Sequence, residues 1–282
     1  MERTANRAVG RQDYWMNNFL GKVHRGDCSV ILPQVPDNSV DLVVADPPYN
    51  LSNDEAILWE EESFAESGHA GLTEDWDKFE DDDYEKLLTM YISECKRILK
   101  PGGSIWTFGT YHNIGLVNVL YNTLGVELLN EIIWYKPDAT PNISGRRFCA
   151  SHENILWGVV GDEPPTFNYE DLKSDSFKDD PINPRGKQPR SVWWISKNIS
   201  DDTDHPTEKP EEVIRRIIKA CSNEGGVVMD PFLGSGTTAV VAKQMGREWF
   251  GIERNEEYAD IAEERIESTV NEVEQYGKLF DL

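Results

Sequence analysis

The sequence predicts an α/β fold with a parallel or mostly parallel sheet, and three observations lead to that prediction. Short apolar runs alternate along the chain with amphipathic, helix-like segments, as they do when helices connect parallel strands. Two of these runs end in an aspartate followed by a proline, at Asp46 and Asp230. A glycine-rich turn with Gly234 and Gly236 separates the second run from a helical segment. The chain has 282 residues, 39% of them apolar, which is enough to bury a large core.

Six segments are expected to form strands, because each is short and rich in β-branched or aromatic residues. They are residues 40–45, 104–108, 131–134, 155–160, 227–229 and 249–252. Helical periodicity marks residues 84–99, 211–221, 237–245 and about 256–276. The first of these helices is expected to stop at Lys100-Pro101-Gly102-Gly103, and the last follows Asn255, a suitable N-cap.

Two stretches break this alternation of strands and helices. Residues 52–83 are acidic with little periodicity, and residues 161–204 are polar and rich in proline, aspartate and lysine around Trp193-Trp194. Loops of this length inside an α/β domain are usually functional or disordered. We therefore expect one domain over residues 20–282, with a mobile acidic loop over 52–83 and a long polar insertion over 161–204.

The glycine loop at residues 230–238, DPFLGSGTT, predicts a ligand at the end of a strand. Gly234 and Gly236 let the backbone turn sharply and approach a ligand closely, and the following helix start supplies free N–H donors. The loop lacks the lysine of a P-loop, and Ala239 stands where a dinucleotide-binding pattern has its third glycine. Glu253 alone could be a surface acid, but at the end of the next strand it can accept both hydroxyls of a ribose. We therefore expect a nucleoside-like cofactor.

The segment Asp46-Pro47-Pro48-Tyr49 and the glycine loop together resemble the amino-group DNA methyltransferases that use S-adenosylmethionine. Other segments resemble the same family: GDC at 26–28, WYKPDATPN at 134–142, RRFCASHENILW at 146–157 and HPTEKP at 205–210. The tetrapeptide precedes the glycine loop, which is the order of the family's β class, where the target-recognition region lies between the two. The resemblance covers about residues 20–268.

This resemblance implies a Rossmann-like, mostly parallel sheet of seven strands with helices on both faces, in a circularly permuted motif order. It implies a single methyltransferase domain with residues 138–204 as the approximate target-recognition region, S-adenosylmethionine as cofactor and duplex DNA as partner. The implied catalytic residues are Asp46, Pro47, Pro48 and Tyr49. The implied cofactor-binding residues are Asp27, Cys28, Asp46, His205, Thr207, Lys209, Asp230, Phe232, Gly234, Ser235, Gly236, Thr237, Thr238 and Glu253. Arg146, Arg147, Lys187 and Arg190 are the expected DNA contacts, and no metal is expected.

The chemistry of an exocyclic amine explains the tetrapeptide. The amine is a poor nucleophile, because its lone pair is delocalised into the ring. Asp46 can accept one hydrogen bond from the amine and the Pro47 carbonyl the other, which aims the lone pair at the methyl group. Proline fixes the backbone that holds this carbonyl, and Tyr49 offers a face on which an extruded base can stack. His152 and Glu153 could form a polar bond that supports the site, but a structural polar pair is the favoured interpretation.

The target base stays open between two choices. Aspartate at the head of the tetrapeptide favours adenine N6, whereas serine is commoner among cytosine-N4 enzymes of this family, so cytosine N4 is the main alternative. An RNA methyltransferase or a non-catalytic DNA-binding relic is a more distant alternative. No cysteine follows a proline, so covalent catalysis at a ring carbon is not expected.

The acidic composition indicates the solution conditions in which the protein works and says little about the active site. The net charge is −23, whereas proteins that bind nucleic acids usually carry a basic surface. We favour the interpretation that the chain has a solvated acidic surface suited to high salt. This interpretation implies a halophilic host. The four cysteines form no CxxC pair, which argues against a zinc site or a disulfide framework. With no secretory signal or run of transmembrane length, we expect a cytoplasmic protein without a membrane partner. A restriction endonuclease partner, and a monomer or a homodimer, are compatible with the sequence.

Overall fold

The computed structural model describes residues 15, 17–50, 80–139, 141, 146–175, 180–197 and 209–271. Most of the acidic loop expected over 52–83, together with His205 and Thr207, lies outside the described residues. Within them, no helix combines the length and the apolar character that crossing a bilayer requires.

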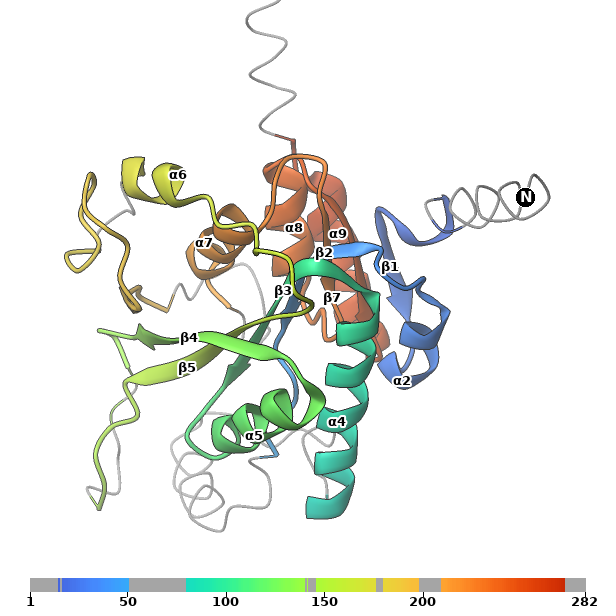
Figure 1. Cartoon of the computed structure of the whole chain (residues 1–282), viewed down its shortest axis with the longest axis horizontal. Coiled ribbons are helices and arrows are strands. Elements are labelled where there is room, and N and C mark those ends of the chain that lie inside the picture. Colours follow the sequence, from blue (N-terminus) through green and yellow to red (C-terminus); the bar gives the residue numbers. More distant parts are fainter. Residues whose placement is uncertain are drawn as a thin grey trace, which may run out of the picture.

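Within the described residues, the centre of the fold is a single sheet of eight strands (Figure 1). In spatial order they are β1 (Lys22–Arg25), β8 (Glu248–Glu253), β7 (Val227–Asp230), β2 (Val40–Ala45), β3 (Leu99–Gly109), β5 (His152–Val159), β4 (Glu127–Tyr135) and β6 (Val192–Trp194). All neighbours run parallel except β5, which is antiparallel to both β3 and β4. The mostly parallel sheet is confirmed, with eight strands where the resemblance implied seven.

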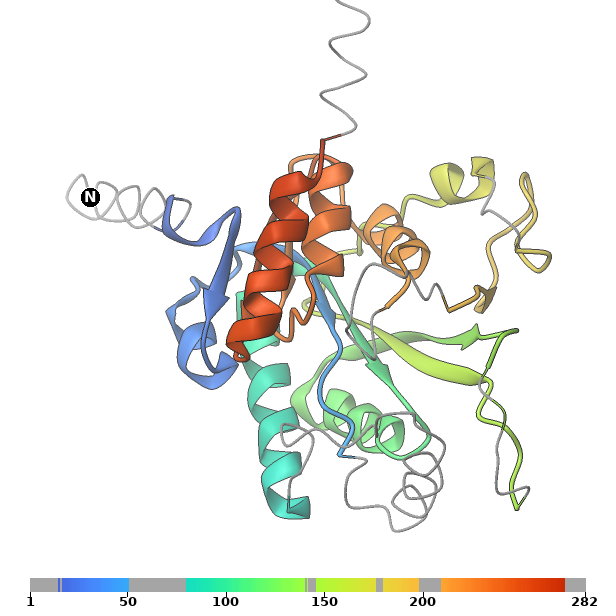
Figure 2. The same cartoon turned by 180° about the vertical axis from the view of Figure 1, so that it is seen from behind.

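Helices cover both faces of this sheet, as the views from the two sides show (Figures 1 and 2). One face packs against α7 (Glu211–Cys221), α8 (Thr237–Gln244) and α9 (Glu256–Ser268). The other packs against α2 (Cys28–Ile31), α4 (Asp81–Ile98) and α5 (Ile114–Leu124). A 3₁₀ turn, η1 (Leu32–Gln34), follows α2, and α6 (Tyr169–Ser174) precedes β6. The result is a three-layer α/β/α arrangement.

Strand β2 shows why its sequence reads as a nearly unbroken apolar run. Leu42 and Val44 point into the core under α7 and α8, whereas Val43 and Ala45 point into the core under α4. A central parallel strand is buried on both faces, so both of its side-chain rows must be apolar. The neighbouring strands β7 and β3 complete that burial.

Several boundaries differ from the sequence-based expectation. Helix α9 ends at Ser268, with Thr269 as its C-cap, and does not continue to residue 276. Helix α4 stops at Ile98, as the Pro-Gly-Gly signal predicts, but the chain passes directly into β3 at Leu99. Trp193 is buried in the core, and its neighbour Trp194 is partly exposed, on the edge strand β6.

The topology gathers the carboxyl ends of the parallel strands at one end of the sheet, its carboxyl edge, where a ligand site can form. The parallel strands β2, β7, β8, β3 and β4 all finish at this edge, and the antiparallel strand β5 begins there. Residues that follow five strands and residues that open the sixth therefore meet, although they are far apart in the sequence. Ligands of open α/β sheets bind at this carboxyl edge.

Candidate active site

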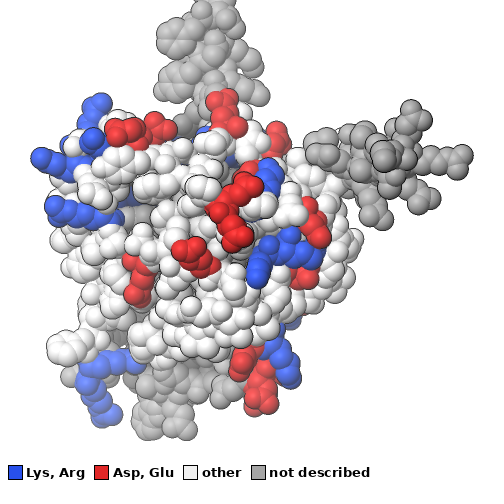
Figure 3. Space-filling view, in the orientation of Figure 1, with Lys and Arg blue, Asp and Glu red and all other residues white. Residues whose placement is uncertain are grey.

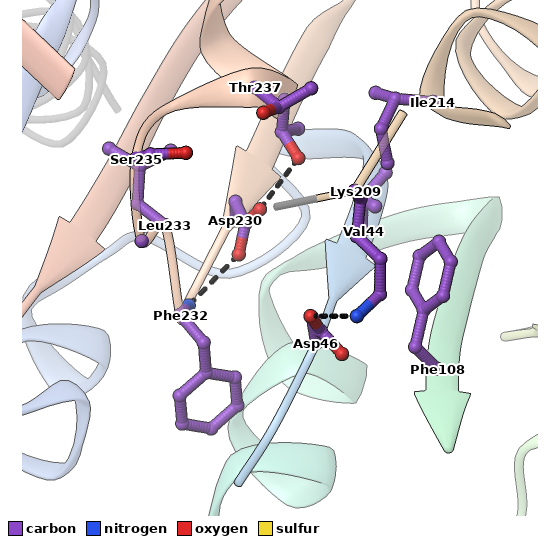
Figure 4. Close-up of a pocket in the computed structure, with 12 residues that line it drawn as sticks. Val44, Asp46, Phe108, Lys209, Ile214, Asp230, Phe232, Leu233, Ser235 and Thr237 are labelled. Carbon is purple, nitrogen blue, oxygen red and sulfur yellow. Dashed lines mark hydrogen bonds and ion pairs between the residues drawn. The ribbon is translucent and has the colours of Figure 1, made fainter. Parts of the chain in front are cut away.

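Asp46 is the first residue after β2, at the carboxyl edge of the sheet. Its Oδ1 accepts a hydrogen bond of 2.6 Å from the Tyr49 hydroxyl. Its Oδ2 lies 2.6 Å from Nζ of Lys209, a contact drawn in Figure 4. The aspartate, the tyrosine and the lysine of the two sequence motifs are thus brought together by the fold.

The tetrapeptide is fixed from behind by side chains of other elements. The Tyr84 hydroxyl, from the first turn of α4, donates to the Pro48 carbonyl at 2.8 Å. Asn113 Nδ2 donates in turn to the Tyr84 oxygen at 2.9 Å, and its Oδ1 accepts from the Thr110 backbone N–H at 2.8 Å. Tyr84 and Asn113 are buried. This chain of hydrogen bonds holds the backbone in place, as a preorganised site requires.

Glu153 and Lys136 extend the charged cluster beyond the motifs. Lys136 follows β4 and Glu153 lies near the start of β5, and the antiparallel pairing of those strands places them side by side. Lys136 Nζ lies 2.9 Å from Glu153 Oε1, and Lys209 Nζ lies 3.6 Å from Oε2. Burial alone would raise the pKa of Glu153, but the ammonium groups of Lys209 and Lys136 outweigh it and hold that pKa below its usual value. The expected pairing of Glu153 with His152 is replaced by these two ion pairs.

Lys209 is the only residue of the HPTEKP segment's expected cofactor set that the described part of the chain includes. Its Nζ lies over the rings of Tyr49 and Phe108, 5.4 Å from each centroid. Burial alone would lower the pKa of Lys209, but the carboxylates of Asp46 and Glu153 outweigh it and raise that pKa. The lysine is therefore a charged ammonium between two carboxylates.

The glycine loop opposite is organised by Asp230, the last residue of β7. Its Oδ1 accepts from the Phe232 N–H at 2.9 Å and its Oδ2 from the Thr238 hydroxyl at 2.6 Å, as Figure 4 shows. Burial raises the pKa of Asp230 to about 7. On the far side of the loop, Arg265 Nη1 donates to the Ser235 carbonyl and hydroxyl at 2.7 and 2.8 Å and to the Thr237 hydroxyl at 3.3 Å.

Both loop glycines have positive φ, +55° at Gly234 and +89° at Gly236. A Cβ at Gly236 would lie 2.9 Å from the Cβ of Ala262 in α9, so only glycine fits between loop and helix. The Gly234 N–H donates to Glu253 Oε2 at 2.7 Å, and the Asn255 N–H to Oε1 at 2.7 Å. Burial raises the pKa of Glu253. The glutamate thus supports the loop from behind.

A cavity of about 50 Å³ lies between the tetrapeptide and the glycine loop (Figure 4). It is lined by Val44, Asp46, Phe108, Lys209, Ile214, Asp230, Phe232, Leu233, Gly234, Ser235, Thr237 and Thr238. Most of the expected cofactor residues that the structure describes therefore face one space. Glu253 adjoins this lining through Gly234.

Asp27 and Cys28 lie on the β1 side of Glu253. The Gly26 N–H donates to the Glu253 carbonyl at 2.8 Å, and Asp27 caps α2 by accepting from the Ser29 N–H at 2.8 Å. The Cys28 side chain is buried in the core under α2 and α4, where burial raises the pKa of its thiol to about 12. Asp27 is thus near Glu253, while the Cys28 thiol packs away from the surface.

The expected DNA contacts form two separate exposed groups. Arg146 and Arg147 precede β5, and Arg147 Nη1 donates to the Tyr111 hydroxyl at 3.4 Å. Lys187 and Arg190 line a surface hollow ahead of β6. Figure 3 shows basic side chains gathered at the upper left, near α6 and the segment before β6, and at the lower left, beside the start of β5. All four side chains are exposed, and their contact with DNA stays a prediction.

The residues that sequence reasoning missed are Lys136, Tyr84 and Asn113, and Glu153 was singled out only together with His152, without its lysine partners. Lys136 and Glu153 stand inside segments already noted for their resemblance, WYKPDATPN and RRFCASHENILW. A charged residue directly after one apolar strand and another at the start of the next was the available signal. The described residues contain no group of histidine, cysteine or acidic side chains arranged to hold a metal ion.

Comparison with known proteins adds independent findings. The model of the N6/N4 methyltransferase family, described as DNA methylase, matches residues 40–264. The Type II methyltransferase M.HinfI of Haemophilus influenzae is 38% identical over 261 residues, covering 89% of this chain and 69% of that protein. The Type II methyltransferase M2.DpnII of Streptococcus pneumoniae is 36% identical over 264 residues, covering 90% and 92%.

Solved structures share the fold. The PvuII DNA methyltransferase, titled cytosine-N4-specific, superposes with a TM-score of 0.67 at 20% identity, covering 88% of this chain and 90% of that one. A DNA modification methylase homologue of Thermus thermophilus, TTHA0409, solved in complex with S-adenosyl-L-methionine, gives a TM-score of 0.57 at 26% identity, covering 87% and 92%.

Proposed function

This chain belongs to the N6/N4 DNA methylase family, and from that premise we propose that it methylates the N6 amine of an adenine swung out of duplex DNA, with S-adenosylmethionine as donor. One observation carries the proposal. The Asp46 carboxylate and the glycine loop of β7 face each other across a single cavity. A nucleophile bound at the first would lie opposite a cofactor bound at the second.

The residues around the glycine loop fit S-adenosylmethionine. The half-buried carboxylate of Glu253 supports the loop at the end of β8, where this class of fold binds ribose hydroxyls. Asp230 and Asp46 give the cavity carboxyl groups that suit a cationic sulfonium. The cofactor, when bound, supplies an electrophilic methyl group. Lys209, Phe232 and the loop backbone are the groups proposed to hold its methionine part.

The tetrapeptide Asp46-Pro47-Pro48-Tyr49 binds and orients the target amine. One N–H of the base donates to Asp46 and the other to the Pro47 carbonyl, so that the nitrogen lone pair points at the methyl carbon. When bound, the cofactor would supply its methyl carbon to this nitrogen, and the electron pair of the broken carbon–sulfur bond would stay on sulfur as a neutral thioether. The nitrogen, now positive, then loses one proton, which the hydrogen-bonded Asp46 carboxylate can accept. Tyr49 stacks on the extruded base.

Adenine is preferred over cytosine because aspartate heads the tetrapeptide, as the family resemblance suggests. Cytosine N4 is the second candidate, since its amine has the same donors and the same geometry would serve it. Both relatives named above are Type II methyltransferases. A partner restriction endonuclease and duplex DNA therefore belong to this proposal, with Arg146, Arg147, Lys187 and Arg190 as contacts to the DNA backbone.

The test is methyl transfer from tritiated S-adenosylmethionine to unmethylated genomic DNA, followed by digestion to nucleosides and mass spectrometry. We expect N6-methyladenine from the wild type. Asp46→Ala should abolish transfer while leaving the Kd for S-adenosylmethionine, from calorimetry, within a few-fold of wild type. Only 4-methylcytosine among the products would reverse the choice of base. Full activity of Asp46→Ala would refute the role given to Asp46.

A further inference from the structure

We propose that Glu153 is a positioning residue that takes Lys209 and the Tyr49 hydroxyl from Asp46 when the target amine arrives. This inference rests on the function proposed above and concerns the same site. It starts from a conflict between the structure and the chemistry. The carboxylate that must accept the amine is already engaged on both of its oxygens.

The engagement of Asp46 is close and mostly buried. Oδ1 accepts from the Tyr49 hydroxyl at 2.6 Å, and Oδ2 lies 2.6 Å from the Lys209 ammonium. The amine nitrogen gains positive charge as the methyl group is transferred. An ammonium held on the same carboxylate opposes that charge and weakens the acceptor that the amine needs. Productive binding therefore favours a Lys209 position farther from Asp46.

One carboxylate oxygen of Glu153, Oε2, can accept both Lys209 and the Tyr49 hydroxyl once they leave Asp46. Its Oε2 lies 3.6 Å from Lys209 Nζ and 3.5 Å from the Tyr49 hydroxyl, so both groups now on Asp46 already face it. A charge-assisted hydrogen bond is about 2.8 Å long, so a shift of about 1 Å would complete each contact. A move of that size needs no change in the backbone.

Lys136 makes Glu153 a fixed acceptor. It holds the other oxygen, Oε1, at 2.9 Å, and the pairing of β4 with β5 sets its place. The exposed fractions of the side chains are 9% for Lys209, 11% for Lys136 and 13% for Glu153, against 27% for Asp46. The acceptor is thus shielded, and the carboxylate that meets the substrate is the more open of the two.

The exchange also preserves the charge balance of the cluster. The cluster keeps two carboxylates and two ammonium groups, so its net charge stays zero through the shift. Both ammonium groups then lie on Glu153, and Asp46, the more exposed carboxylate, exchanges Lys209 and the Tyr49 hydroxyl for an N–H of the amine. Breaking a buried ion pair without replacement is costly, whereas an exchange of partners avoids most of that cost. The pKa directions of Glu153 and Lys209 agree, because both groups stay charged at neutral pH.

The variant Glu153→Gln tests the inference. With the second carboxylate removed, Lys209 stays on Asp46, and we expect the rate at saturating DNA and cofactor to fall by roughly 10-fold to 100-fold. The Kd for S-adenosylmethionine should stay within about threefold, a change of under 1 kcal/mol. Glu153→Asp, which keeps the charge, should recover part of the rate. Glu131→Gln is the matched control, because Glu131 is an exposed glutamate on β4 bonded to Asn154.

A double variant separates this role from a merely structural one. Lys136→Met with Glu153→Gln removes one charge of each sign, so thermal stability should return towards wild type. The methylation rate should nevertheless stay low, because Lys209 still has only Asp46. A wild-type rate in the double variant, or in Glu153→Gln alone, overturns the inference. If wild type and Glu131→Gln both fail to methylate DNA, the proposed function itself falls, and the inference with it.

Discussion

The close packing of the glycine loop on α9 predicts a large effect of Gly236→Ala. The residue has φ +89°, and an added Cβ would lie 2.9 Å from Ala262 Cβ and 3.0 Å from Ala262 Cα. A non-glycine residue in the left-handed region costs about 1–2 kcal/mol. Overpacking a buried contact costs about 1–3 kcal/mol more. We therefore expect the free energy of unfolding to fall by about 2–5 kcal/mol, measured by urea denaturation followed by circular dichroism.

Two other glycines separate the contributions. Gly225 has φ +72°, and a Cβ added there would meet no atom within 4 Å, so Gly225→Ala should show the backbone cost alone. Gly115, exposed in α5, has neither a positive φ nor a close neighbour, and Gly115→Ala should stabilise the protein by about 0.5–1 kcal/mol. If Gly236→Ala is no more destabilising than Gly225→Ala, the contact with α9 does not explain the glycine.

Three further predictions follow from charge. Burial raises the pKa of Asp230 from 3.8 to about 7, so its contribution to stability is full below pH 4 and is lost as the pH rises through 7. The melting temperature of Asp230→Asn, relative to that of the wild type, should therefore rise between pH 5 and pH 8 in differential scanning fluorimetry. A difference in melting temperature that does not change with pH would contradict this. Replacing Arg146 and Arg147 together by alanine should reduce the slope of log K against log salt for DNA binding by about 2, as two lost phosphate contacts require, and an unchanged slope would remove them from the interface. The net charge of −23 predicts a higher urea midpoint in molar KCl than at low salt, because salt screens the repulsion, and equal midpoints would argue against a high-salt protein.

The elements that the sequence predicts well are those whose environment is uniform. Strand β2 was predicted over its full length, since a central strand is apolar on both faces. Strand β1 was missed, because the edge sequence KVHR is half exposed and carries no apolar run. Strand β6 is three residues long, so its two tryptophans gave no periodicity to read. Helix α5 went unnoticed between two predicted strands.

For the site, local motifs were informative and long-range contacts were not. Asp46, Gly234 and Glu253 stand in patterns that reveal their place at strand ends, and the fold brings Asp46 and the glycine loop to one cavity. The partnership of Glu153 with Lys136 and Lys209 depends on strand order. It required knowing that β5 runs against its neighbours, so that its start lies where the others end. No spacing in the sequence carries that information.

The order of strands also has a consequence for biosynthesis. Val43 of β2 pairs with Met229 of β7, 186 residues later in the chain. At a ribosomal rate of about 5–20 residues per second, one edge of the central strand waits roughly 10–40 s for its neighbour. The nascent polypeptide therefore emerges with its most apolar strand unpaired on one side, and a product truncated before β7 could never close the sheet. An unpaired apolar strand favours aggregation, so the connectivity exposes the nascent chain to that risk until β7 has been synthesised.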